Sequence, residues 1–215
     1  MDEIQAMREK ITRIGRMMFE RKITDAAGGN ISARVGERVC ITPRYSGQKW
    51  QWQIQPSQVL VVDLDGKILD GDGVISREGK VHLRLYRDFP DGTAVVHCHP
   101  RNVLTFAALG QPLVPVLEAT WKFGEIKVTP FTPAHSQQLS ENVAAALAGQ
   151  EARVRKHAAA CIAAWHGLFV LGKDLDAAFD AAERLDVNAR IMLQIGLPAA
   201  HERYAALAAD LAKWE

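Results

Sequence analysis

The 215-residue sequence predicts a single α/β domain, residues 1–215, in which helices flank a mainly antiparallel or mixed sheet. Two observations favour this fold class. Helical and strand-like hydrophobic periods both occur, but helices do not follow the strands one by one as they do in a Rossmann fold. In addition, the segment VLVVDLDGKIL contains the hairpin signal Asp65-Gly66, which indicates antiparallel neighbouring strands.

The N-terminal elements follow from changes in hydrophobic period. Apolar residues at three- and four-residue steps predict an amphipathic helix over the first twenty residues. Residues 31–35 and 38–41 then resemble short strands around a turn at Gly36, before the hairpin. Ser76 is predicted to cap a helix that ends at Pro90, and Glu78 would then lie in the first turn of this helix.

The second half of the sequence also predicts both strands and helices. The segment TAVVHCHP predicts a strand that a proline ends, and residues 102–109 predict a helix. A short helix near Trp121, a strand over 126–128 and a helix in SQQLSENVAAALAG should follow. Two apolar runs around His166-Gly167 predict two strands, and an alanine-rich helix should run from about Asp174 to Gly196, with another helix after it.

Composition excludes several classes of function. Lys+Arg 26 against Asp+Glu 25 leaves a formal net charge of +1, so no nucleic-acid partner is expected. The N-terminus is charged and no run of about 18 apolar residues occurs, so neither a signal peptide nor a membrane anchor is expected and the cytoplasm is the expected location. The odd number of cysteines, Cys40, Cys98 and Cys161, favours reduced, buried thiols.

Histidines provide the main chemical signal. His97 and His99 are two residues apart on a predicted strand, so both imidazoles should project from one face while Cys98 projects from the other. His166 stands at a break between two apolar runs, beside a glycine, and could supply a third ligand. Three histidines with an open position are typical of a catalytic zinc site. The alternative to a metal site is that His97 and His99 are simply a buried pair of histidines that form hydrogen bonds. His82, His135, His157 and His201 have no such partners and are not expected in the site.

The acidic and glycine-rich candidates are less specific. Glu78 in a first helical turn could merely stabilise the helix dipole, although a metal site that performs proton transfer also needs a base. The segment GGNIS, at 28–32, and Ser46-Gly47 could bind a phosphate through backbone N–H groups. Both could equally be ordinary turns.

These motifs together resemble the class II aldolase/adducin family. The resemblance covers nearly the whole chain and is carried by GGNIS at 28–32, Ser46-Gly47, Ser76-Arg77-Glu78 followed by His82-Leu83, HCHP at 97–100 and WHG at 165–167. It implies a three-layer α/β/α sandwich with a mainly antiparallel central sheet. It also implies a homo-oligomer, often a four-fold cyclic homotetramer, with active sites between subunits.

The resemblance also implies roles for individual residues. His97, His99 and His166 would hold a divalent metal, Zn²⁺ or another ion such as Mn²⁺, Fe²⁺ or Co²⁺. Glu78 would be the catalytic acid/base. The substrate- or phosphate-binding residues would be Gly29, Asn30, Ser46, Gly47, Ser76 and Arg77. The implied activity is that of a lyase, an aldolase or decarboxylase, which cleaves a small sugar phosphate or sugar acid through a metal-stabilised enediolate.

Three departures from the family pattern keep other readings open. Arg44-Tyr45 is inserted after Thr42-Pro43, and Arg77 stands where a second serine is common. Either arginine could bind a phosphate or a substrate carboxylate, or could simply lie at the surface. Glu118 lies near the catalytic acid of the family's dehydratases, so it is a second catalytic candidate.

Other functions compete with the lyase reading. Epimerase or dehydratase chemistry on the same metal site is one alternative, and a non-catalytic adducin-like interaction domain is another. A cupin-type oxygenase also begins with His-x-His, but HCHPRNVLTF lacks the glutamate expected soon after that pair.

Overall fold

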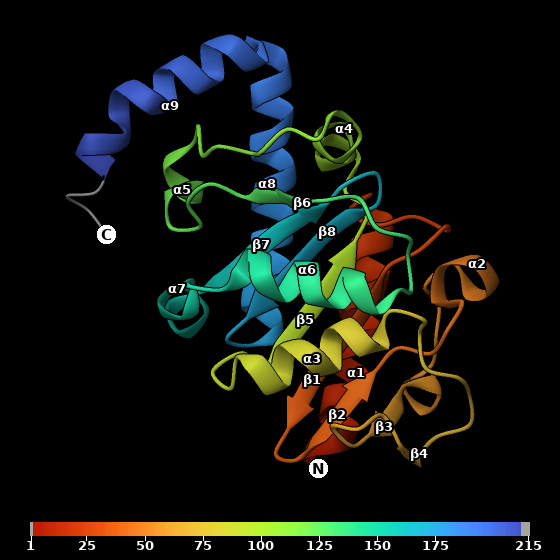
Figure 1. Cartoon of the computed structure of the whole chain (residues 1–215). Coiled ribbons are helices and arrows are strands. Elements are labelled where there is room, and N and C mark those ends of the chain that lie inside the picture. Colours follow the sequence, from red (N-terminus) through yellow and green to blue (C-terminus); the bar gives the residue numbers. More distant parts are fainter. Residues whose placement is uncertain (1, 212–215) are drawn as a thin grey trace.

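The computed structural model describes residues 2–211 and contains one eight-stranded sheet (Figure 1). The order of the strands across the sheet is β4-β3-β2-β1-β5-β8-β7-β6. Their bounds are β1 Asn30–Val35, β2 Arg38–Ile41, β3 Leu60–Val62, β4 Ile68–Asp70, β5 Ala94–Cys98, β6 Lys127–Thr129, β7 Ala158–Ala163 and β8 Gly167–Gly172. The central neighbours β5 and β8 therefore come from distant parts of the chain.

The sheet is mixed, so the expectation of a mainly antiparallel sheet needs one correction. Every neighbouring pair from β4 to β7 is antiparallel, but β6 and β7 are parallel. The chain between these two strands passes through helices α6, Gln137–Leu147, and α7, Glu151–Lys156. A crossover of this kind returns the chain to the same end of the sheet, so the next strand runs parallel to the previous one.

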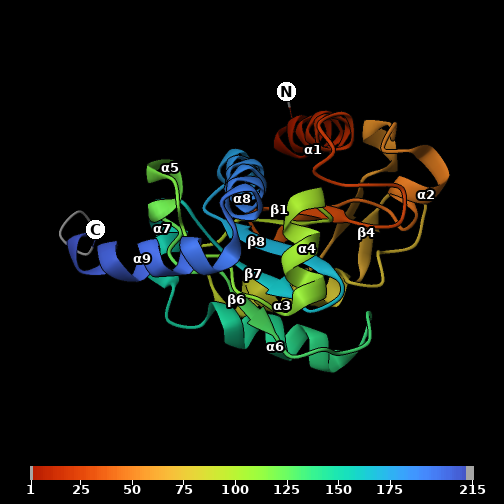
Figure 2. The ribbon, with the colours of Figure 1, turned by 90° about the horizontal axis from the view of Figure 1, so that it is seen from above.

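Helices cover both faces of the sheet, as expected for a three-layer α/β/α arrangement. Figure 2 shows α1 and α8 on one side and α3 and α6 on the other. One core joins the first face to α1, α4 and α8, and a second core joins the opposite face to α3, α6 and α7. The bounds are α1 Glu3–Glu20, α2 Ser46–Trp50, α3 Gly79–Asp88, α4 Arg101–Leu109, α5 Glu118–Trp121, α6 Gln137–Leu147, α7 Glu151–Lys156, α8 Leu175–Ile195 and α9 Leu197–Leu211, with a 3₁₀ turn at Pro56–Gln58.

Strand alternation determines which side chains can reach the site. In β5, Val96 and Cys98 belong to the core under α8, so His97 projects to the opposite face together with Val95. This confirms that Cys98 points away from His97. All three cysteines are buried and free, as expected for reduced structural thiols.

One predicted helix start is wrong. Helix α3 begins at Gly79, and Glu78, not Ser76, occupies its N-cap position. As the N-cap residue, Glu78 precedes the first turn, and its side chain makes no capping hydrogen bond. The reason is that Ser76 Oγ accepts hydrogen bonds from the Asn30 side chain and from the backbone N–H of Glu78. The turn before α3 is thus tied to strand β1.

No helix in the described part of the chain is both long and apolar enough to cross a bilayer.

Candidate metal and catalytic site

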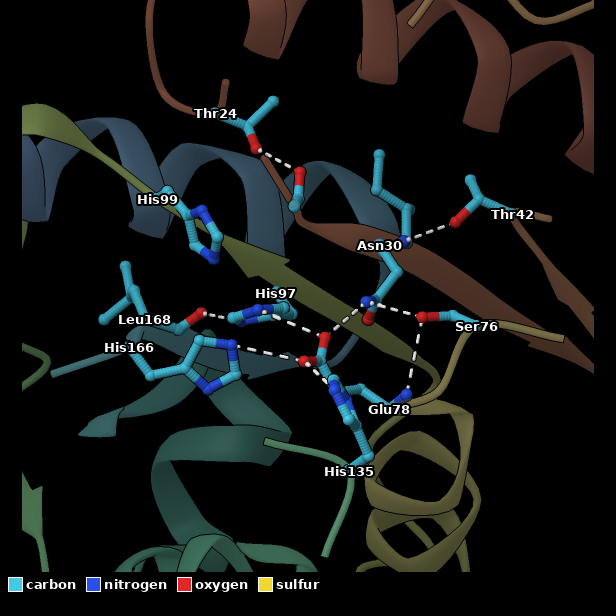
Figure 3. A network of polar contacts seen from close by, with 12 residues as sticks. Thr24, Asn30, Thr42, Ser76, Glu78, His97, His99, His135, His166 and Leu168 are labelled. Carbon is cyan, nitrogen blue, oxygen red and sulfur yellow. Dashed lines mark hydrogen bonds and ion pairs between the residues drawn. The ribbon is translucent and has the colours of Figure 1, made fainter. Parts of the chain in front are cut away.

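Three histidines meet at one end of the central strands (Figure 3). His97 lies in β5, His99 follows directly after it, and His166 lies in the turn between β7 and β8. Because β8 pairs with β5, this turn is brought beside the end of β5. One potential ligand atom from each histidine lies within 4.8 Å of the others. The structure thus brings together the three residues that the sequence analysis selected as metal ligands.

Two of the imidazoles are held in place through Nδ1, which leaves Nε2 of each ring free to bind a metal. His97 Nδ1 lies 2.9 Å from the carbonyl oxygen of Leu168, and His99 Nδ1 lies 3.2 Å from Asp25 Oδ1. Carbonyl and carboxylate oxygens accept hydrogen bonds, so each Nδ1 carries the proton and each Nε2 keeps its lone pair. Neither Nε2 has a hydrogen-bond partner although both are buried. Burial lowers the pKa of His97 well below its usual range, which favours the neutral, ligating imidazole. These features fit a divalent metal.

Two glycines allow the His99 ring to pack closely. A Cβ atom at Gly28 would lie 2.5 Å from His99 Cε1, and one at Gly167 would lie 2.7 Å from His99 Cδ2. Real side chains do not tolerate such contacts. Gly167 is the glycine of the WHG motif, so its role in close backbone approach, inferred from the sequence, agrees with the geometry.

A buried carboxylate faces the triad. Glu78 Oε2 lies 3.3 Å from His97 Nε2, and Glu78 Oε1 lies 3.2 Å from His166 Nε2. The Asn30 amide donates a hydrogen bond of 2.7 Å to Oε2. Burial raises the pKa of Glu78, but the contact with His166 and the hydrogen bond from the Asn30 amide act against burial and hold this pKa below its usual range. Glu78 is therefore placed to ligate a metal or to exchange a proton with a substrate bound there.

An open cavity of about 240 Å³ adjoins these groups. All six residues expected to bind substrate or phosphate line it, namely Gly29, Asn30, Ser46, Gly47, Ser76 and Arg77. Glu78, His99 and His166 line it as well, together with Arg44 and His135. A single small, polar molecule in this cavity could touch His99, His166 and both arginines.

Two residues near the triad were missed by the sequence analysis. His135 was not expected in the site, yet its Nδ1 lies 3.9 Å from Glu78 Oε1, and its backbone adopts a left-handed φ of 72°. Asp25 supports His99, as described above. No local pattern distinguishes either residue in the sequence, because a loop histidine after Pro-Ala and a loop aspartate have many ordinary uses.

Glu118 is not brought to this cavity. It is exposed and begins helix α5, which packs against α8, and it is absent from the residues that line the cavity. Within one chain, the structure therefore offers Glu78 but not Glu118 as an acid/base near the histidines.

Comparisons with known proteins agree with this arrangement. The model of the family "Class II Aldolase and Adducin N-terminal domain" matches residues 9–193. The 5-deoxy-D-ribulose 1-phosphate aldolase of Bacillus thuringiensis is 30% identical over 193 residues, which cover 89% of this chain and 86% of the relative. The 3-oxo-tetronate 4-phosphate decarboxylase of Haemophilus influenzae is 28% identical over 200 residues and covers 88% of each chain.

Solved structures show the same likeness. The L-fuculose-1-phosphate aldolase of Thermus thermophilus superposes with a TM-score of 0.71 at 27% identity, over 86% of this chain and 91% of that protein. The family match spans most of the chain and includes every residue of the histidine triad and of the cavity. The protein therefore belongs to the class II aldolase and adducin N-terminal domain family.

Proposed function

We propose that this protein is a metal-dependent lyase that cleaves a carbon–carbon bond in a small sugar phosphate or sugar acid. The observation that carries the proposal is the histidine triad with Glu78 beside it. The aldolase and decarboxylase names of its relatives support the same reaction type. In both reactions, bond cleavage leaves negative charge on a carbonyl oxygen and requires a proton at carbon.

The metal and the assembly are part of the same proposal. Zinc suits three imidazole ligands, and the bound ion would supply Lewis-acid stabilisation of negative charge on substrate oxygens. We also propose one catalytic domain over residues 1–215, a cytoplasmic location and a homotetramer, in line with the family resemblance.

The residues of the chain would hold the metal, orient the substrate and exchange protons with it. His97 and His99 are oriented by Leu168 and Asp25, so the sheet and the loop before β1 would hold the two imidazoles in position for a metal. Glu78 would accept a proton from the substrate and return one to the carbon at which the bond has broken. The Asn30 amide, which donates to Glu78 Oε2, holds the carboxylate in this position.

Two substitutions test the proposal. Metal content should be near one equivalent in native protein purified without chelators, and His166→Ala should lose most of it. Glu78→Gln should retain metal through the three histidines, yet lose at least about a hundredfold in turnover, the usual scale of general acid–base assistance.

The alternatives give different results. Native protein that takes up no metal would favour a non-catalytic interaction domain, and unchanged turnover in Glu78→Gln would remove that residue from the mechanism. Product analysis separates the reactions, because an aldolase gives two carbonyl fragments, a decarboxylase gives CO₂, an epimerase gives an isomer and a dehydratase releases water.

A further inference from the structure

A fourth imidazole lies at the Glu78 carboxylate, and the proposed function gives it no role. His135 belongs to the loop 130–136 between β6 and α6, and its Nδ1 lies 3.9 Å from Glu78 Oε1 (Figure 3). The ring lines the same cavity as His99 and His166. Because β6 is an edge strand of the sheet, this loop reaches the triad from a different part of the fold than β5 and the turn between β7 and β8.

The backbone at His135 has a conformation that few side chains adopt. Its φ of 72° lies in the left-handed region, which glycine enters without steric cost and most other residues avoid. The next residue, Ser136, caps α6, and its Oγ accepts a hydrogen bond of 3.0 Å from the backbone N–H of Leu139. Less populated backbone conformations of this kind concentrate at functional sites, so a function of the His135 side chain is indicated.

The loop 130–136 is fastened to the turn that carries the third histidine of the triad. The ring of Phe131 lies against the ring of Trp165, with the two centroids 5.1 Å apart. Trp165 directly precedes that histidine, and its backbone N–H donates to the carbonyl oxygen of Ala107 in α4 at 3.0 Å. The loop is therefore held at one end by this ring pair and at the other end by the cap of α6. Both attachments keep its imidazole beside the carboxylate.

The two oxygens of Glu78 differ in their supply of hydrogen-bond donors. Oε2 accepts a hydrogen bond of 2.7 Å from the Asn30 amide. Oε1 lies 3.2 Å from His166 Nε2, a nitrogen that lies beside the same carboxylate as the free Nε2 of His97. With a metal bound, these two nitrogens would give their lone pairs to the ion and would offer the carboxylate no hydrogen. Oε1 would then need a donor from elsewhere.

His135 can supply this donor. Its Nδ1 is buried and has no hydrogen-bond partner. A carboxylate only accepts hydrogen bonds, so the proton of a neutral imidazole beside it belongs on Nδ1. The distance of 3.9 Å to Glu78 Oε1 is too long for a hydrogen bond, and a shift of roughly 1 Å would form one. The His135 side chain is 37% exposed and has room for such a shift.

We propose that His135 is a positioning residue whose Nδ1–H donates a hydrogen bond to Glu78 Oε1 in the metal-loaded enzyme. Together with the Asn30 amide at Oε2, it would fix the orientation of the carboxylate that exchanges a proton with the substrate. This inference rests on the proposed function and adds a residue to it. The contribution to rate would be large, because a displacement of about 1 Å in a reacting group can cost about a hundredfold in rate.

The first test is spectroscopic and needs no substrate. ¹⁵N NMR of zinc-loaded protein with labelled histidine rings reports which ring nitrogen carries the proton. The His135 resonance, assigned as the one missing from His135→Gly, should show a proton on Nδ1 that exchanges slowly with water. Glu78→Ala should make this exchange at least about tenfold faster, because it removes the charged acceptor. A proton on Nε2 alone, or an exchange rate that Glu78→Ala leaves unchanged, would overturn the inference.

Three variants separate positioning from packing. His135→Gly removes the ring where the backbone favours glycine, so the protein should stay folded and keep its zinc. For the sugar phosphate or sugar acid that the native enzyme cleaves, its kcat should fall at least about tenfold and its KM should change less than about twofold. His135→Asn tolerates the left-handed backbone and places an amide N–H near the position of Nδ1, so it should restore part of kcat. Lys22→Gly, at an exposed residue with a φ of 64° outside the cavity, is the matched control and should keep the native kcat.

The contrary results are distinct. Loss of zinc from His135→Gly would make His135 a metal ligand, and a native kcat in that variant would leave it without a role, so either result overturns the inference. Equal losses of kcat in His135→Asn and His135→Gly would also contradict it, because the donor would then be immaterial. Failure of the proposed function is separate, since it would show as native protein that takes up no zinc, and the inference would fall with it.

Discussion

At the scale of single residues, the site depends on groups that touch the proposed metal ligands as much as on the histidines themselves. Asp25 accepts the Nδ1 proton of His99 and also the backbone N–H groups of Ala27 and Gly28, at 2.9 Å and 3.2 Å. The hydrogen bond from His99 lowers the pKa of the Asp25 carboxyl, so it is ionised at neutral pH. A fixed carboxylate of this kind orients an imidazole and makes it a stronger ligand.

Substitution of Asp25 should therefore weaken metal binding without removing a ligand. Asp25→Ala is expected to lower zinc affinity by about 10- to 100-fold, and Asp25→Asn should lower it less because the amide oxygen still accepts a hydrogen bond. Competition with a chelating dye measures this affinity directly. Asp72→Asn, an exposed aspartate in a loop, is the control. Native affinity in Asp25→Ala would contradict the positioning role.

His82, one turn into α3, should make stability depend on pH. It is fully buried, its Nδ1 lies 2.7 Å from Ser32 Oγ, and Ser32 Oγ in turn lies 2.7 Å from the Tyr86 hydroxyl. Burial lowers its pKa from 6.5 to about 4. The unfolded chain therefore binds a proton more readily than the folded protein between these values, and stability is lost as pH falls through this window.

The expected loss is about 2 kcal/mol between about pH 7.5 and about pH 5, from the difference in proton binding. Urea unfolding at both pH values would measure it. His82→Gln should remove this part of the pH dependence, whereas His201→Gln in α9 should keep it. An identical pH dependence in His82→Gln and in the native protein would be inconsistent with a buried, neutral His82.

At the scale of elements, the sequence was most informative where periodicity is strong. Helices α1, α4 and α8, both hairpins and the strands that carry His97 and flank His166 were all predicted near their observed bounds. Two short helices, α2 and α7, were not predicted. Helix α2 begins after Tyr45 in a left-handed conformation, and α7 has six residues, so neither shows a helical period. The start of α3 was misplaced because Ser76 bonds to Asn30, a contact across 46 residues that no local pattern contains.

The same distinction applies to the site. His97 and His99 follow from strand geometry, because alternate residues share a face. His166 was placed by its break between apolar runs and by the family resemblance. His135 and Asp25 act through contacts between loops, and such contacts follow from the assembled sheet instead of from the spacing of residues.

The turn between β7 and β8 should tolerate no side chain at Gly167. An added Cβ would lie 2.7 Å from both the carbonyl oxygen of Cys98 and His99 Cδ2, so β5 or the ring must move. Gly167→Ala should lower metal affinity and destabilise the fold by about 1–3 kcal/mol. Thermal unfolding with and without metal measures both effects. Gly73→Ala meets only ordinary contacts, from 3.4 Å, and is the matched control. Native metal affinity in Gly167→Ala would show that the ring is less confined than the geometry implies.

At the scale of the whole molecule, the surface supports the proposed assembly. Phe131 and Trp165 are 58% and 72% exposed, and their rings form a pair with centroids 5.1 Å apart beside the turn that carries His166. Large exposed aromatic residues are enriched where proteins associate. Glu118, which lies outside its own chain's cavity, could reach a cavity only in a neighbouring subunit.

Mixing two inactive variants tests this arrangement. If Glu118 acts across an interface, Glu78→Gln and Glu118→Gln should each be impaired, and a co-refolded mixture should regain part of the native turnover. Mixed oligomers would then contain sites with Glu78 from one subunit and Glu118 from the other. A mixture no more active than the average of its parents would show that Glu118 does not complete a neighbour's site.

The position of the histidines on β5 and beside β8 also affects how the protein folds. In the unfolded chain only His97 and His99 are close together, and His166 joins them when β8 pairs with β5 across a long loop. Closing such a loop is slow and entropically costly, so a metal ion held by the three histidines could not guide the first steps of folding. It would bind once the central strands have met, and it would then slow their separation.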